Sequence, residues 1–277
     1  MTTLVITGGA SGLGLAMAQY WSARTSNAHI CVVDRNEDQK QQALDAIKNS
    51  GGHGYFFACD VTQDEQVDKL LSFVEQELPP VDVLINCAGV PTAGTVEGET
   101  LSAWQWVLDI NLLGTVRLVK AFTPLFRQRA QGHIVNVASQ AGITPMPIMG
   151  SYNATKAAIV AFSETLKLEL APFGIGVSVL CPAFVKTNLD KSLHEDQQNM
   201  QAVVSKLVQR GTVSPEQVAA KTYDAVAKNR FMIVTHKEGR SALRMKRWLP
   251  SLYYWLMAKK TKQFTQQGYA NDASHHS

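Results

Sequence analysis

The chain contains 277 residues, of which 45% are hydrophobic and 18% are charged, and its formal net charge is +3. No apolar run approaches the roughly 20 residues that a membrane-spanning helix needs, and the N-terminus lacks the basic and then apolar order of a secretion signal. These features exclude a membrane-spanning or secreted class. We therefore expect a soluble, cytoplasmic protein with a well-filled core and no nucleic-acid partner.

The cysteines give the same indication of compartment. Cys31, Cys59, Cys87 and Cys181 lie far apart, in or beside apolar runs. This spacing is not that of a metal site, so we expect no bound metal and predict buried free thiols in a reducing compartment.

Short apolar, β-branched runs alternate with longer segments of helical period along the chain. Strands are expected at 3–7, 29–34, 54–59, 81–86, 133–139, 176–182 and 230–235. Helices are expected at 13–24, 64–78, 104–126 and 153–173. This alternation predicts right-handed βαβ units and an α/β fold, with a Rossmann-type, doubly wound parallel sheet of about seven strands.

Two segments depart from the alternation. Residues 188–217 form a polar, helix-like stretch after the sixth strand, and we expect 188–214 to be a mobile lid over the substrate. Residues 238–277 form a basic, aromatic extension after the last strand, which leaves 1–237 as one domain.

A glycine-rich turn, TGGASGLG, follows the first strand and leads directly into a helix. Its Gly8, Gly12 and Gly14 have the spacing Gly-x-x-x-Gly-x-Gly instead of the dinucleotide fingerprint Gly-x-Gly-x-x-Gly. Such glycines permit close backbone approach, and the helix N-terminus offers free N–H groups to a pyrophosphate. On its own the segment fits either a dinucleotide site or a plain tight turn.

Asp34 ends the second strand, 20 residues after Gly14. A carboxylate at this position accepts both hydroxyls of an adenosine ribose and repels a 2′-phosphate. Arg35, the next residue, is able to pair with such a phosphate. We expect NAD as the cofactor because the carboxylate is at the strand end itself, and NADP is the less favoured alternative.

The third and fourth strands are each followed by a further candidate cofactor contact. Asp60 is placed to bond an adenine amine and Val61 to pack on the ring, although an aspartate also suits a turn or a helix cap here. NCAG contains Asn86, Ala88 and Gly89 and suits a glycine-permitted turn beside the cofactor.

Tyr152 and Lys156 are four residues apart in GSYNATKAAIVAF, so they project from the same face of the expected helix. A phenol beside an ammonium is a possible proton-transfer pair. The spacing alone also fits an ordinary amphipathic helix, so its meaning depends on the motifs around it.

Together these motifs resemble the short-chain dehydrogenase/reductase family over roughly residues 3–236, in their order after successive strands. The matches are TGGASGLG, Asp34, CDV, NCAG, Asn111 in DINLLGT, Ser139 in NVASQAG, YNATK and PAFVKT. One departure is that Ala183 follows Pro182 where the family commonly has glycine, and its β-carbon would narrow the nicotinamide pocket.

The resemblance implies an oxidoreductase that moves a hydride between the cofactor and a secondary alcohol or ketone. Tyr152 would be the base, and Lys156 with the oxidised nicotinamide would lower its pKa from about 10. Ser139 would orient the substrate oxygen, and Asn111 would support a water leading from Lys156 to bulk solvent. Lys156 would also hold the nicotinamide ribose. The other implied cofactor contacts are Ser11, Leu13, Pro182, Val185 and Thr187.

Two other functions stay open beside this one. The first is an NADP-dependent carbonyl reductase, and the second is a non-catalytic dinucleotide sensor that kept only the fold. The complete set of Asn111, Ser139, Tyr152 and Lys156 argues against the sensor. The resemblance also implies a homodimer or homotetramer.

The expected substrate is hydrophobic. QAGITPMPIMGS precedes Tyr152, and candidate contacts are Ile143, Met146, Pro147, Ile148, Met149 and Phe184, which would equally suit simple loop packing. A steroid, a retinoid or a long aliphatic alcohol fits such a pocket better than a sugar.

Charge and aromatic residues concentrate near the C-terminus. Residues 228–262 hold ten Lys and Arg against one acid, a net charge of +9 that leaves −6 for the remainder. An apolar cluster lies among them: Trp248, Leu249, Leu252, Tyr253, Tyr254, Trp255, Leu256 and Met257.

Pro250 should interrupt any helix near residue 249 and give two short segments. The region suits peripheral membrane contact through 240–262, packing on the protein's own substrate pocket or a neighbouring subunit, or a solvated basic face.

Overall fold

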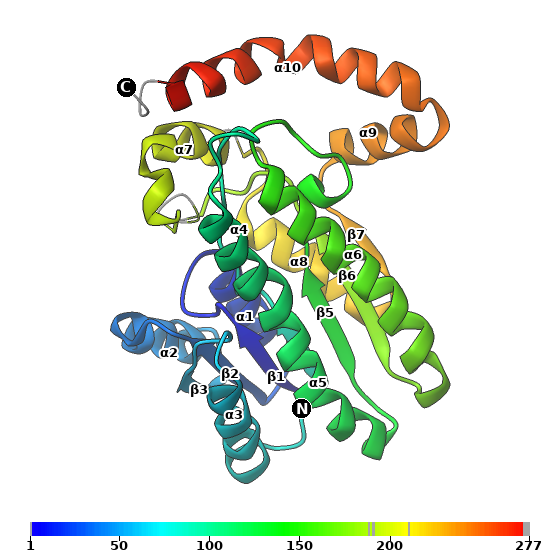
Figure 1. The fold of residues 1–277 in the computed structure, drawn as a ribbon. Helices are drawn as coiled ribbons and strands as arrows, with labels where there is room; N and C mark the ends of the chain where they lie inside the picture. Colours follow the sequence, from blue (N-terminus) through cyan, green and yellow to red (C-terminus); the bar gives the residue numbers. More distant parts are fainter. Residues whose placement is uncertain (1, 188, 190–191, 210, 274–277) are drawn as a thin grey trace.

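One sheet of parallel strands, in the order β3-β2-β1-β4-β5-β6-β7, organises the described part of the chain. The computed structural model describes residues 2–187, 189, 192–209 and 211–273. The strands are β1 (Thr2–Thr7), β2 (Ala28–Asp34), β3 (His53–Ala58), β4 (Val83–Asn86), β5 (His133–Val137), β6 (Gly176–Cys181) and β7 (Met232–Val234). This confirms the expected doubly wound, Rossmann-type architecture (Figure 1).

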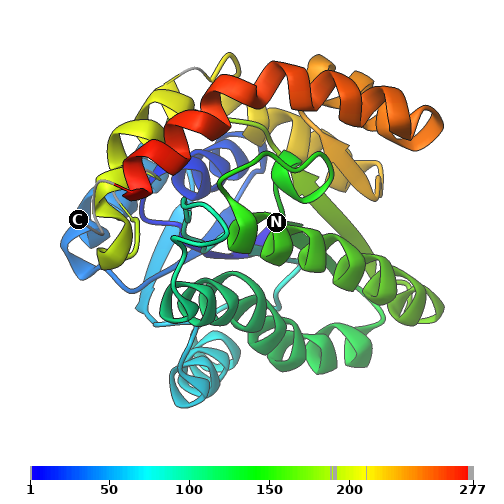
Figure 2. The same ribbon diagram turned by 45° about the horizontal axis from the view of Figure 1, so that its top comes forward.

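Helices cover both faces of the sheet (Figure 2). On one face a hydrophobic cluster joins the strands to α1 (Gly12–Arg24), α2 (Lys40–Asn49) and α8 (Pro215–Ala227). On the other face a second cluster joins them to α3 (Asp64–Glu77), α5 (Gly114–Arg129) and α6 (Gly150–Leu170). Both clusters lie beneath the strand ends that carry the predicted site residues.

The first strand shows why these sequences become buried strands. Leu4 and Ile6 pack into the α1 and α8 side, whereas Val5 packs into the α3 and α5 side, and all three are fully buried. Successive strand residues point to opposite faces, so an uninterrupted apolar run suits a strand covered on both sides.

The helix expected at 104–126 contains a π-helical turn. α4 (Leu101–Leu108) continues through the turn Asp109–Leu113 directly into α5. An extra residue in a helical turn changes the direction of the side chains that follow it, and such turns often occur at functional sites. Asn111 lies inside this turn.

The segment expected to be a lid packs onto the site side of the molecule. It contains a short, kinked 3₁₀ segment, Glu195–Met200, and α7 (Gln201–Gln209). Its buried residues Leu193, Met200, Val204 and Val208 form a cluster with Ala93 and Ile148. Positions 188, 190–191 and 210 of the predicted lid lie outside the described residues, and the lid's mobility stays a prediction.

The C-terminal extension forms two helices, α9 (Lys237–Trp248) and α10 (Pro250–Ala273), separated at Leu249. The predicted interruption at Pro250 is confirmed, but the prediction that both segments are short is wrong, because α10 has 24 residues. Proline is well tolerated at the first position of a helix, where its missing N–H is not needed.

α10 runs across one end of the molecule, over α7 and the loop before α6 (Figures 1 and 2). None of the helices in the described ranges combines the length and hydrophobicity needed to cross a membrane.

Candidate active site

Tyr152 and Lys156 lie in the first turns of α6, on one face of the helix, and are only 8% and 5% exposed. The Lys156 Nζ lies 5.8 Å from the centre of the Tyr152 ring and donates a hydrogen bond of 3.0 Å to the carbonyl oxygen of Val137. The end of β5 therefore holds the ammonium beside the phenol, and the predicted pair is brought together.

Ser139 lies two residues beyond β5 and faces the same pair. Its Oγ accepts a hydrogen bond from the Ala141 N–H at 3.1 Å and donates to the carbonyl oxygen of Pro182 at 3.4 Å. Its side chain also acts on the Tyr152 phenol, whose pKa it lowers. The ends of β5 and β6 thus place one hydroxyl at the proposed proton-transfer centre.

Burial dominates the electrostatics of this centre. It raises the pKa of the Tyr152 phenol above its ordinary value, and the Ser139 side chain acts in the opposite direction. Burial also lowers the pKa of Lys156 to about 8, against the opposing influence of Cys87 and Cys181. Both groups are thus biased toward their neutral forms, because low-dielectric surroundings disfavour charge.

Asn111 fixes the loop that follows β4. Its Oδ1 accepts a hydrogen bond from the Val90 N–H at 2.8 Å, and its Nδ2 donates to the Val90 carbonyl oxygen at 2.9 Å. Gly89 lies between Asn111 and Lys156, since a β-carbon there would be 3.1 Å from Asn111 Oδ1 and 3.3 Å from Lys156 Nζ. Asn111 thus lies beside Lys156. Its two hydrogen bonds to Val90 hold the loop after β4 in place, a role that the sequence did not indicate.

The glycine turn is too tightly packed to accept larger residues. Gly8 and Gly12 have φ angles of +63° and +52°, in the left-handed region that favours glycine. A β-carbon on Gly8 would come within 2.9 Å of Ala88 Cα, and one on Gly14 would overlap the Gly8 carbonyl oxygen. These contacts hold the first turn of α1 against the turn that precedes it, and that turn against the loop after β4.

Asp34 stands at the edge of the same turn. Its Oδ2 accepts a hydrogen bond from the Ala10 N–H at 3.2 Å, and its Oδ1 accepts one from the Asn36 N–H at 3.1 Å. The carboxylate is thus oriented by backbone on both sides, at the carboxyl end of β2, as the sequence predicts.

The neighbouring strand end is held by a local turn. Asp60 Oδ1 accepts hydrogen bonds from the backbone and the hydroxyl of Thr62, at 2.9 and 2.8 Å. Val61 is buried and packs against Gly114, where a β-carbon would come within 2.7 Å of it. Asp60 therefore has a structural partner in addition to its proposed adenine contact.

The remaining predicted cofactor residues fall into two groups. Ser11, Leu13, Ala88, Pro182, Val185 and Thr187 lie on segments that follow strands β1, β4 and β6. A β-carbon on Gly12 would be 3.3 Å from Thr187, so the glycine turn and the segment after β6 face each other. Asn86 instead lies within β4, 3% exposed, and donates a hydrogen bond of 2.8 Å to Asn136 inside the sheet.

The predicted substrate residues are not all in one place. Ile143 packs into a cluster with Ala138 and Ile159, beneath α9. Ile148, which has a positive φ of 55°, packs instead with the 188–217 segment. Met149 is buried, and Met146, Pro147 and Phe184 are partly exposed.

A buried carboxylate, Glu99, joins the 188–217 segment to the start of α6 and was not predicted. Its Oε2 accepts a hydrogen bond from the Ser151 N–H at 3.1 Å, and its Oε1 accepts from the Ser151 hydroxyl and from Gln197 Nε2. Thr92 completes the network by bonding the Ser151 hydroxyl and the Tyr152 N–H. The partners of Glu99 are 52 and 98 residues away in the sequence, so no local motif marks it.

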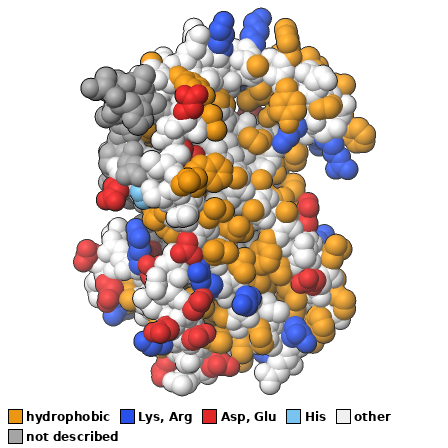
Figure 3. Space-filling model, viewed as in Figure 1, with side chains coloured by type: hydrophobic (Ala, Val, Ile, Leu, Met, Phe, Trp, Pro, Cys, Tyr) orange, Lys and Arg blue, Asp and Glu red, His pale blue; other side chains and the backbone are white. Residues whose placement is uncertain are grey.

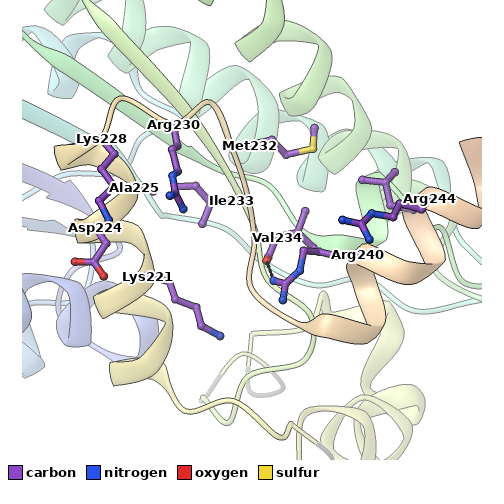
Figure 4. Close-up of a pocket in the computed structure, with 11 residues that line it drawn as sticks. Lys221, Asp224, Ala225, Lys228, Arg230, Met232, Ile233, Val234, Arg240 and Arg244 are labelled. Atoms are coloured by element: carbon purple, nitrogen blue, oxygen red, sulfur yellow. Dashed lines mark hydrogen bonds between the residues drawn. The ribbon is translucent and has the colours of Figure 1, made fainter.

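A separate surface cavity of about 630 Å³ lies at the edge strand β7, between α8 and α9 (Figure 4). Its lining includes the cations Lys221, Lys228, Arg230, Arg240 and Arg244 and the single acid Asp224. None of the proposed catalytic side chains lines it, so it is distinct from the site around Tyr152.

Known proteins are similar to this chain in sequence and fold. A 2,3-dihydro-2,3-dihydroxybenzoate dehydrogenase of Bacillus subtilis is 31% identical over 72% of this chain and 76% of its own length. A short-chain dehydrogenase/reductase of Burkholderia phymatum, solved in complex with NAD, superimposes with a TM-score of 0.84 at 30% identity, over 91% of this chain and 94% of its own. A variant of actinorhodin polyketide ketoreductase, solved with NADPH, gives a TM-score of 0.72 at 26% identity, over 84% and 95% of the two chains.

The family model described as short chain dehydrogenase matches residues 2–198, a span that contains the glycine turn, Asn111, Ser139, Tyr152 and Lys156. The resemblance predicted from the sequence is therefore confirmed. This chain belongs to the short-chain dehydrogenase family and is an oxidoreductase that binds a nicotinamide cofactor.

Proposed function

We propose that the protein is an NAD-dependent dehydrogenase that interconverts a hydrophobic secondary alcohol and the corresponding ketone. The observation that carries this proposal is the buried pair of Tyr152 and Lys156, with the Ser139 side chain lowering the pKa of the phenol. A phenol held in this way is suited to exchange one proton with a substrate oxygen.

The packing around the glycine turn fits a dinucleotide. Gly8, Gly12 and Gly14 let the turn, the loop after β4 and the segment after β6 pack closely at the N-terminus of α1, and helix N-termini bind phosphate. The proposed contacts are Gly8, Ser11, Gly12, Leu13, Gly14, Asp34, Asp60, Val61, Ala88, Gly89, Tyr152, Lys156, Pro182, Val185 and Thr187. When bound, the nicotinamide supplies hydride transfer, which no side chain of the protein can perform.

Each catalytic side chain then has a task that matches its position. Tyr152 Oη accepts the hydroxyl proton in oxidation and donates it in reduction. Ser139 orients the substrate oxygen and lowers the pKa of the phenol. Lys156 holds positive charge near the phenol when it is protonated, and Asn111 keeps the loop beside it in place. The burial of the pair excludes bulk water from the proton transfer.

The preference for NAD rests on Asp34, because a carboxylate at the end of β2 opposes a 2′-phosphate. The alternative, an NADP-dependent carbonyl reductase, is favoured by Arg35 and has a structural neighbour solved with NADPH. We expect a higher kcat/KM with NAD than with NADP. Asp34→Asn should lower the ratio of kcat/KM with NAD to kcat/KM with NADP, and Arg35→Ala should raise it. Equal or better turnover with NADP by the unaltered protein would overturn the assignment.

The hydrophobic substrate is proposed from the residues that flank the site. Ile148 and Met149 come before Tyr152, and Phe184 lies on the segment after β6, so a steroid, a retinoid or a long aliphatic alcohol is a better fit than a sugar. NADH absorbance should report turnover of such alcohols in a panel. Turnover confined to polyols or sugars would contradict this part of the proposal.

We further propose that residues 1–237 form the catalytic domain, that 238–277 extend it, and that the protein acts in the cytoplasm as a homodimer or homotetramer. Hydrophobic side chains are exposed on and beside α5 and α6, including Leu113 at 45% and Leu168 at 76% exposed (Figure 3). Sedimentation equilibrium of the full chain should give a multiple of the 30.3 kDa protomer mass. A monomer at micromolar concentration would refute this assembly.

A further inference from the structure

α10 has one face that the protein covers. Tyr253 is 3% exposed, and Phe264 packs against the cluster that holds Ile148 and the 188–217 segment. A β-carbon on Gly268 would come within 2.7 Å of Ile148, so the helix lies directly on this loop. The spacing of Tyr253, Phe264 and Gly268 matches one side of a helix. The contacts on this covered side hold α10 in place. They bury only part of the aromatic cluster of residues 248–257.

The opposite face of α10 and the end of α9 expose large apolar side chains. Their exposed fractions are 75% for Trp248, 55% for Leu249, 44% for Leu252, 60% for Trp255 and 37% for Leu256. Leu252, Trp255 and Leu256 follow the helical spacing of three and four, so they share the side that faces away from Ile148. A contiguous apolar surface of this kind on a folded protein indicates a partner.

Cations border this apolar surface. The Arg247 guanidinium lies 5.7 Å from the centre of the Trp248 ring, and Lys259 Nζ lies 5.6 Å from the centre of the Trp255 ring. Lys259 and Lys262 are exposed and follow Leu252 and Trp255 along the same side of α10. Figure 3 shows basic and hydrophobic side chains adjoining over α9 and α10. We call Arg247, Trp248, Leu249, Leu252, Trp255, Leu256, Lys259 and Lys262 the outer face.

The positive charge of the outer face favours an anionic lipid surface over a second copy of the chain as its partner. Glu238 is the only acid between residues 228 and 262, against ten Lys and Arg. A two-fold contact between two copies would bring the same cations together, which is unfavourable. Indole rings with cations beside them suit a lipid interface, where rings enter the headgroup region and cations meet anionic headgroups.

We propose that the outer face docks the protein peripherally on a membrane surface that contains anionic lipid. The covered side of α10 contacts Ile148, so docking holds the loop before Tyr152 close to the apolar phase. If the proposed function is correct, a membrane-dissolved alcohol then has a short path to the site, but the docking itself does not depend on it.

Vesicle sedimentation of the full-length protein tests this proposal. We expect it to bind vesicles of phosphatidylcholine with about 30% phosphatidylserine, to bind phosphatidylcholine alone much more weakly, and to lose binding in high salt. Trp248→Ser combined with Trp255→Ser should weaken binding at least about tenfold. Arg247→Gln, Lys259→Gln and Lys262→Gln together should weaken it roughly a hundredfold, at about one power of ten for each 1.4 kcal/mol.

Matched variants separate the outer face from general charge and hydrophobicity. Lys48→Gln, Lys69→Gln and Lys120→Gln remove the same charge from exposed positions elsewhere, and Leu101→Ser removes a similarly exposed apolar group. These controls should bind vesicles like the unaltered protein. Absence of vesicle binding by the full chain would overturn the proposal, as would binding that the controls reduce as much as the outer-face variants do. A fall in oligomeric mass in the tryptophan variant, with no vesicle binding by the full chain, would assign the face to a second copy instead.

Discussion

The proposed cofactor side and the proposed substrate side of this molecule are built by different kinds of contact. On the cofactor side, Gly8 meets Ala88 and Asp34 accepts a hydrogen bond from Ala10, each at the end of a strand in the sheet. On the substrate side, Ile148 is covered by residues of the 188–217 segment and by α10, which come from far along the chain. The first side is fixed by backbone geometry, whereas the second depends on side-chain packing between separate segments.

The comparison predicts that changes at the catalytic end of the sheet affect chemistry most. Lys156→Ala should lower turnover by about 10²–10⁴-fold, because the phenol loses its neighbouring ammonium, and it should also weaken NADH binding. Lys167→Ala, on the exposed side of the same helix, serves as the control and should change neither quantity. Steady-state kinetics and NADH fluorescence titration measure both, and near-normal turnover by Lys156→Ala would contradict its proposed role.

On the cofactor side, a single added methyl group should be costly. Gly14→Ala places a β-carbon against the Gly8 carbonyl oxygen, and overpacking of this kind costs about 1–3 kcal/mol, or roughly 10–100-fold in NADH affinity. Gly150→Ala is the matched control, since its β-carbon would come no closer than 3.5 Å to another residue. Equal NADH dissociation constants for the two variants would show that the turn is looser than the structure indicates.

On the substrate side, the buried Glu99 network should govern stability. Glu99→Ala removes the acceptor for the Ser151 N–H, the Ser151 hydroxyl and Gln197, which should lower the free energy of unfolding by about 3 kcal/mol. Glu97→Ala, at an exposed position two residues away, should lower it by less than about 0.5 kcal/mol. Urea unfolding compares the two variants, and similar urea midpoints would show that the Glu99 network does not stabilise the fold.

The sequence predicts the two sides unequally for the same physical reason. The glycine turn, Asp34 and the Tyr152–Lys156 pair follow from a strand end or a helical repeat, so neighbouring residues suffice to place them. Glu99 has partners 52 and 98 residues away, and nothing near it in the sequence points to them. The length of α10 and the burial of Tyr253 beside the exposed Trp255 likewise depend on what the helix packs against.

The smallest expected effect is on the pH dependence of kcat/KM, through Ser139, which lies between the two sides. Burial raises the pKa of the Tyr152 phenol and the Ser139 side chain lowers it, so kcat/KM for alcohol oxidation should rise with pH as phenolate forms. Ser139→Ala removes the lowering contribution and should shift that rise to higher pH, whereas Ser139→Thr keeps a hydroxyl and should shift it less. An unchanged profile in Ser139→Ala would show that this hydroxyl does not tune the phenol.

The most direct measurement compares turnover and cofactor binding in Tyr152→Phe. This variant keeps the ring in its buried position and removes only the ionisable hydroxyl, so the cofactor side should be left intact while proton transfer is lost. We predict an NADH dissociation constant within about threefold of the unaltered protein, and turnover of a verified secondary alcohol reduced at least about 10²-fold. Appreciable turnover by Tyr152→Phe on that alcohol would contradict the assignment of Tyr152 as the group that exchanges the substrate proton.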